Sequence, residues 1–196
     1  MRKGEETQER VVERALQLAT RDGLDGLTIG SLAAELGLSK SGLFAHFRSK
    51  EDLQLQVLKA AAERFRILVI QPALAAQRGE PRVRALFDNW FAWGNHPAMP
   101  GGCIFVAAAI EFDDRPGPLR DFLVESQTAF LAALARAVRL AAEVGHFRPE
   151  VDAEQFAFDM YAIVLGFHHA SRLLHDNKAE LRARTAFERL LALARA

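Results

Sequence analysis

A short glycine-centred pattern near the start of the chain constrains its fold more than any other feature. Within residues 28–47, Ala33 is small enough to lie where two helices cross, Gly37 can adopt the positive φ of a tight turn, and Leu43 offers an apolar anchor. Their spacings of four and six residues fit a helix-turn-helix unit. The pattern therefore predicts two short helices joined at Gly37.

The second of these helices would begin with polar side chains that are small or long enough to reach a partner. In a helix-turn-helix unit that binds DNA, this end of the second helix faces the base edges in the major groove. Hydroxyl and amino groups form the hydrogen bonds by which bases are read. We therefore predict DNA-reading positions at Ser39, Lys40, Ser41 and Gly42.

The charge of the whole chain gives no general attraction to nucleic acid, because 25 basic residues are balanced by 25 acidic ones. Locally the balance differs, since no acidic residue lies between Glu35 and Glu51. The helix start at Thr28 adds a hydroxyl and backbone N–H groups that are able to bind a phosphate oxygen. The basic side chains predicted to face phosphates are Lys40, Arg48 and Lys50, with His46 as a fourth.

The segment from Thr28 to Leu53 resembles the DNA-binding domain of the tetracycline-repressor (TetR) family of transcriptional regulators. Its ending, His46-Phe-x-x-Lys-Glu-x-Leu53, is rarely found outside that family, and the resemblance extends over roughly residues 5–65. It implies a homodimer that binds a palindromic double-stranded DNA operator. Such proteins are usually repressors that a small ligand releases from the operator, and the resemblance implies no catalytic residue, metal or cofactor. The sequence also shows neither a secretory signal nor an apolar run long enough for a membrane span, so we expect a cytoplasmic protein.

One position departs from the family pattern. The family commonly has Tyr where this chain has Phe44, and the tyrosine hydroxyl usually bonds a phosphate. A phenyl ring has no group for that bond. We therefore expect Phe44 to lie at the DNA interface, with phosphate affinity resting on Lys50, His46 and Thr28.

The remainder of the chain favours an all-α fold, because Ala and Leu are abundant and no stretch alternates apolar and polar residues for long enough to predict a strand. We expect a three-helix DNA-binding domain over residues 1–50. A helical bundle for ligand binding and dimerisation would cover residues 51–196, with the fourth helix shared between the two. About nine helices are predicted, over roughly residues 5–22, 29–36, 40–47, 49–72, 83–94, 103–112, 119–144, 153–175 and 177–196.

Aromatic side chains are concentrated in the second predicted domain, and most of them are expected to form its core. A bundle this rich in aromatic rings is also suited to enclose an apolar pocket with a few polar groups. The side chains predicted to line such a pocket are Trp90, Phe105, Met160, Tyr161, Val164 and His168.

The last two predicted helices each have an apolar stripe and are the best candidates for pairing with a second copy of the chain. Two copies in two-fold symmetry would form a four-helix interface, and the small residues in it would permit a close approach. The predicted interface residues are Phe156, Ile163, Gly166, Phe167, Ala170, Leu181, Phe187 and Leu190.

Few other residues suggest chemistry. Cys103, the one cysteine, is predicted to be a buried apolar residue, or alternatively a redox sensor at a helix start. His168 and His175 are too far apart for one metal ion, and the acids at residues 111–114 are expected to cap helix ends in solvent. Two rival functions remain open: a helical-bundle enzyme and a protein-binding adaptor. A nucleophile–base pair and a glycine-rich phosphate loop, which would favour an enzyme, are missing from the sequence.

Overall fold

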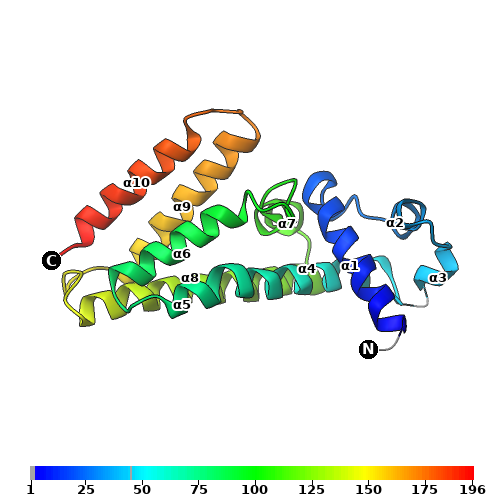
Figure 1. The fold of residues 1–196 in the computed structure, drawn as a ribbon, viewed down its shortest axis with the longest axis horizontal. Coiled ribbons are helices and arrows are strands. Elements are labelled where there is room, and N and C mark those ends of the chain that lie inside the picture. The colour runs from blue at the N-terminus through cyan, green and yellow to red at the C-terminus, as the bar shows by residue number, and fades with distance from the viewer. Residues whose placement is uncertain (1–2, 45) are drawn as a thin grey trace. The chain divides into compact units, whose positions relative to one another are not determined.

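The computed structural model of the chain describes residues 3–44 and 46–196, and the regular elements in these ranges are helices (Figure 1). The all-α prediction is therefore confirmed. In chain order the helices are α1 (Lys3–Asp22), α2 (Ile29–Leu36), α3 (Lys40–Phe44), α4 (Lys50–Phe65), the π-helix η1 (Arg66–Ile70), α5 (Gln71–Ala75), α6 (Glu80–Trp93), α7 (Ile104–Phe112), α8 (Pro118–Glu143), α9 (Ala153–Arg172) and α10 (Ala179–Ala194).

The helical run that starts at Lys50 contains Pro72, and it changes from an α-helix to a π-helix before that residue. α4, η1 and α5 follow one another without a gap, and Pro72 lies in the first turn of α5. Proline lacks an N–H and its ring clashes with the carbonyl four residues earlier in a regular α-helix. The wider π-helical turn at Arg66–Ile70 precedes that point. Counted as one helix, this run gives nine helices in the described ranges, as expected.

The chain packs into two compact units. Residues 1–65 and 95–125 form the first unit, and residues 66–94 and 126–196 form the second. The sequence placed residues 95–125 with the second domain, whereas they pack with the first. The first unit therefore has α7 in addition to the helix-turn-helix.

The core of the first unit lies between α1 and α4. Val11 and Leu16 of α1 are buried, as are Leu53 and Val57 of α4. The helical spacing of these residues gives each helix one apolar face, and burying that face is what stabilises so short a domain.

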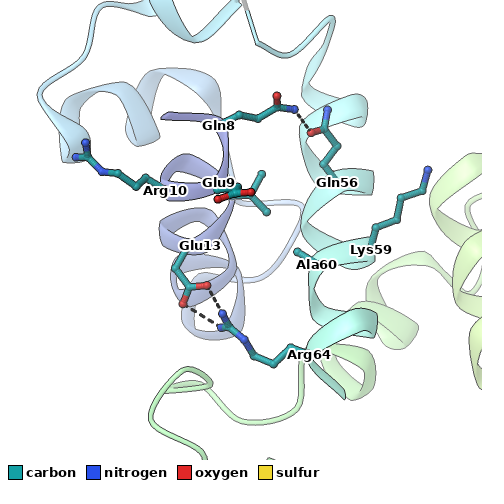
Figure 2. A pocket seen from close by; sticks show the side chains of 9 residues that line it. Gln8, Glu9, Arg10, Glu13, Gln56, Lys59, Ala60 and Arg64 are labelled. Atoms are coloured by element: carbon teal, nitrogen blue, oxygen red, sulfur yellow. Dashed lines mark hydrogen bonds and ion pairs between the residues drawn. The ribbon is translucent and has the colours of Figure 1, made fainter. Parts of the chain in front are cut away.

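Polar side chains also connect α1 and α4. Gln8 donates to Gln56 over 2.6 Å, and Arg64 forms a two-pronged ion pair with Glu13 (Figure 2). Beside them lies an open hollow of about 890 Å³, which is lined mainly by polar side chains of both helices. The charged lining and wide opening do not resemble a site for an apolar ligand.

The core of the second unit is built on stacked aromatic rings. The ring of Phe87 lies 3.8 Å from that of Phe187, and Phe91 lies 3.9 Å from Phe167. These pairs join α6 to α9 and α10, which pack side by side (Figure 1). Among the described residues, no helix combines the length and hydrophobicity that crossing a bilayer requires.

Candidate nucleic-acid interface

Local hydrogen bonds fix both ends of α2. Thr28 is its N-cap: the hydroxyl accepts from the N–H of Ser31 over 3.0 Å, and the Ser31 hydroxyl accepts from the N–H of Thr28. At the other end Gly37 has φ of 64°, and the next N–H donates to the carbonyl of Ala33. A Cβ at Gly37 would meet no atom within 4 Å, so the backbone conformation is what favours glycine there.

Helix α3 is shorter than the predicted 40–47. The described helix ends at Phe44, and residue 45 lies outside the described residues. Its start is fixed by Ser39, whose hydroxyl accepts from the N–H of Gly42 over 3.1 Å. Leu43 is fully buried and anchors the helix, as predicted from its place in the pattern.

The outer face of α3 is open to solvent. Ser39, Lys40, Ser41 and Gly42 are exposed, and Phe44 is 55% exposed. The Lys40 side chain lies beside Gly30 of α2, where an added Cβ would come within 3.3 Å of the lysine Cε. The predicted base-reading positions thus lie together at one exposed end of α3, which the buried Leu43 anchors.

The predicted phosphate contact Lys50 is engaged within the protein. Its ammonium donates to the backbone carbonyl of Asp25 over 2.5 Å and to the carboxylate over 3.2 Å. Arg115 donates to the other carboxylate oxygen over 2.8 Å. Hydrogen bonds from Arg115 and then Lys50 hold the pKa of Asp25 below its ordinary value.

The remaining predicted DNA contacts differ in how far burial or other hydrogen bonds already engage them. The Thr28 hydroxyl is occupied in the helix cap, so it would meet a phosphate while keeping that bond. His46 is half-buried, with its ring 6.4 Å from that of Phe47. Arg48 is exposed, and its backbone N–H donates to the carboxylate of Asp52.

Sequence reasoning missed the side chains that hold the turn between α1 and α2. Glu111, expected to cap a helix end in solvent, instead accepts from the N–H groups of Leu24 and Asp25. Gln54 donates to the carbonyl of Leu24 from a buried position. A signal for Glu111 exists in the sequence, because it is the one charged residue of the otherwise apolar α7.

The residues predicted for a ligand pocket fall into both units. Phe105 lies in the first unit, where its ring meets the edge of Phe65 at 5.9 Å. The others lie in the second unit, where the Trp90 ring is 5.2 Å from that of Tyr161. Met160 and Val164 are buried beside Tyr161 on α9. The pocket itself stays a prediction.

His168 completes the predicted pocket set, and its buried Nε2 has no hydrogen-bond partner among the residues that the structure describes. Burial, then the charges of Arg172 and His169, lower the pKa of His168 from its ordinary value. Both effects disfavour the charged imidazolium.

The residues predicted for the dimer interface need a correction. Phe156, Phe167 and Phe187 are buried in the core of this chain, so they are not available to a second copy. Ile163, Ala170 and Leu190 are partly covered, and Gly166 and Leu181 are exposed. The apolar positions that α9 does expose on one helical face are Phe158, Ala162, Leu165 and Gly166.

Two family profiles match the chain. The profile of bacterial regulatory proteins of the tetR family matches residues 11–57, which hold the helix-turn-helix. The profile of the tetracyclin repressor-like C-terminal domain matches residues 79–187, more than half of the chain.

Individual proteins are similar over longer ranges. The class A tetracycline repressor protein from transposon 1721 of Escherichia coli is 31% identical over 62% of this chain and 52% of the relative, so the chain spans about half of its length. The crystal structure of a TetR transcriptional regulator from Chloroflexus aurantiacus is 32% identical, with coverage of 98% and 96% and a TM-score of 0.86. The structure of AibR with isovaleryl coenzyme A and operator DNA shares the fold at 19% identity, with coverage of 95% and 97% and a TM-score of 0.73.

Proposed function

The chain belongs to the TetR family of bacterial regulatory proteins, and we propose that it is a sequence-specific DNA-binding repressor and not an enzyme. The observation that carries the proposal is the open end of α3, where Ser39, Lys40 and Ser41 are exposed together. A five-residue helix, anchored by Leu43 and preceded by the Gly37 turn, presents this end to solvent.

The contacts would divide into those that read bases and those that hold phosphates. Lys40 and the two serines face base edges once α3 enters the major groove. Lys50, Arg48 and the α2 helix start would bind the flanking backbone and give the complex its salt dependence. Because Lys50 already holds the Asp25 carboxylate, its net contribution to phosphate binding is smaller than that of an unpaired lysine.

A single α3 reads only a few base pairs, so useful specificity requires two copies held about one DNA turn, or a multiple of it, apart. We place the dimer contact on the exposed face of α9. Gly166 lies at the C-terminal end of this face, and no atom of the described residues would lie within 4 Å of an added Cβ there, so a second helix has room to approach. Leu181 adds an exposed apolar side chain on α10.

A small apolar or aromatic ligand would release the DNA. The support is the group of rings from three helices of the second unit, in which Trp90 contacts Phe130 at 4.8 Å as well as Tyr161. Tyr161 donates to Gln127 over 2.5 Å, and His168 offers a further polar atom. Few polar groups among many apolar ones suit recognition of such a ligand. AibR, of the same fold, has been solved with isovaleryl coenzyme A and operator DNA, so this fold can accommodate both kinds of partner.

Selection of bound duplexes from a random library tests the proposal. We expect one enriched site made of two inverted half-sites, with centres about 10 base pairs or a multiple of that apart. Recovery of duplexes with no shared sequence would contradict sequence-specific binding.

A further inference from the structure

The carboxylate of Glu111 reaches from α7 to the turn that precedes α2. One of its oxygens accepts from the N–H of Leu24 over 3.1 Å, and the other accepts from the N–H of Asp25 over 2.7 Å. Gly23 makes room for it: an added Cβ there would lie 2.8 Å from the same carboxylate, and φ at Gly23 is +82°. The absence of a side chain at Gly23 thus leaves the space in which Glu111 of α7 bonds to this turn.

The turn accepts and donates more side-chain hydrogen bonds than an exposed turn requires. Besides Glu111, Gln54 donates to the Leu24 carbonyl over 2.7 Å, while Lys50 and Arg115 bond Asp25. Water would otherwise satisfy the polar groups of an exposed turn. Here four side chains fix the turn instead: Gln54 and Lys50 of α4, Glu111 of α7, and Arg115, which follows α7. The turn leads directly into the Thr28 cap of α2, so its position determines where the helix-turn-helix begins.

The chain connects α7 to the second unit on both of its sides. Residues 95–125 belong to the first unit, and the residues before and after them belong to the second. α8 starts in the first unit at Pro118 and continues as one helix into the second, where it contributes Gln127 and Phe130. Along the chain, these residues of the second unit are therefore joined to α7 through α8 and the short segment at residues 113–117.

We propose that Glu111 is a positioning residue for DNA recognition, which couples α7 to the helix-turn-helix by holding the Leu24 and Asp25 amides. This inference rests on the proposed function and assigns its regulatory link. When α7 is in place, the charged carboxylate fixes the turn, and α2 and α3 follow it. When α7 shifts, both amides lose their acceptor and α3 loses its set position.

The variant Glu111→Gln tests the proposal, because the amide keeps the size of the side chain but has one acceptor oxygen in place of two. We expect its affinity for the selected duplex to fall at least tenfold. The slope of affinity against salt should stay unchanged, since no phosphate contact is removed. Amide hydrogen exchange over residues 24–44 should become faster, which a defect confined to α7 would not produce.

Asp114→Asn is the matched control. It removes one negative charge three residues further on, and Asp114 is exposed with no side-chain bond among the described residues. This variant should bind like the wild type.

Wild-type affinity and unchanged exchange in Glu111→Gln would overturn the proposal. If that variant does not fold, Glu111→Asp decides, because it keeps the charge but is one methylene shorter and cannot reach both amides from the same position; wild-type affinity in that variant would overturn the proposal. A wild-type protein that binds no duplex would overturn the proposed function itself, and this inference with it.

Discussion

Lys50, at the start of α4, is bonded to Asp25 of the α1–α2 turn through both the backbone carbonyl and the carboxylate. In the proposed complex, the same lysine would bind a DNA phosphate. Carboxylate and phosphate would then compete for one ammonium group, a competition that the sequence pattern around Lys50 does not reveal.

Replacing Lys50 tests its role at the backbone. Lys50→Ala should weaken binding to every duplex similarly and reduce the slope of log affinity against log salt by about one, since one phosphate contact is lost. Lys59→Ala is the control, because it removes the same charge from an exposed position further along α4. A loss confined to the selected duplex would contradict the backbone role.

Replacing Lys40 tests base reading. Lys40→Ala should cost about 1–3 kcal/mol on the selected duplex, the usual value of a good base contact, and much less on random DNA. Titrations of both duplexes at one salt concentration measure this difference. Equal losses on the two duplexes would move Lys40 from base reading to phosphate binding.

Phe44→Tyr should tighten binding to all duplexes. The ring is 55% exposed, so a hydroxyl fits without repacking, and a new hydrogen bond to phosphate contributes about 0.5–1.5 kcal/mol. Phe44→Leu serves as the control, because it keeps an apolar side chain without a hydroxyl. Unchanged affinity in Phe44→Tyr would show that position 44 does not face the DNA backbone.

Gly166→Arg tests the proposed dimer face. The open space around Gly166 lets the variant fold, while a charged side chain within the contact should leave a monomer by sedimentation. DNA affinity should then drop to the non-specific level. Gly166→Ala should remain dimeric. A dimeric Gly166→Arg protein with normal affinity would remove this face from the interface.

The lowered pKa of Glu80 predicts that the stability of the second unit depends on pH. Hydrogen bonds from Arg195 and also from Arg84 lower its pKa from 4.5 to about 2. Because the folded-state pKa is the lower one, the carboxylate stabilises the fold above about pH 4.5, and that contribution is lost as the pH falls toward 2.

The partly exposed ion pairs suggest a contribution of about 1–2 kcal/mol at neutral pH. Chemical unfolding of Glu80→Gln should show this deficit at pH 7 and a shrinking one below pH 4.5. Glu143→Gln, at an exposed position on α8, should show no such trend. A deficit in Glu80→Gln that is the same at pH 7 and pH 3 would exclude this role.

The helix-turn-helix could be predicted because its rules are local. Thr28 caps the residues that immediately follow it, and Gly37 takes the φ that its own turn requires. The π-helix before Pro72 was missed, because a proline indicates a disturbance but not how the helix accommodates it.

The long-range contacts could not be predicted in the same way. An apolar stripe shows that Phe167 and Phe187 are buried, but not whether their partners belong to the same chain or to a second copy. They stack on Phe91 and Phe87 of α6, far away in the sequence. Glu111 and Leu24 are separated by 87 residues, so only the fold brings them together.

The central claim is that this chain recognises one DNA sequence through α3. The most direct test measures wild-type affinity for the selected duplex and for a shuffled duplex of equal length and composition, over a series of salt concentrations. We predict that both affinities fall with salt and that the selected duplex binds tighter by about 10³-fold or more at physiological salt. Equal affinities for the two duplexes at every salt concentration would contradict the claim.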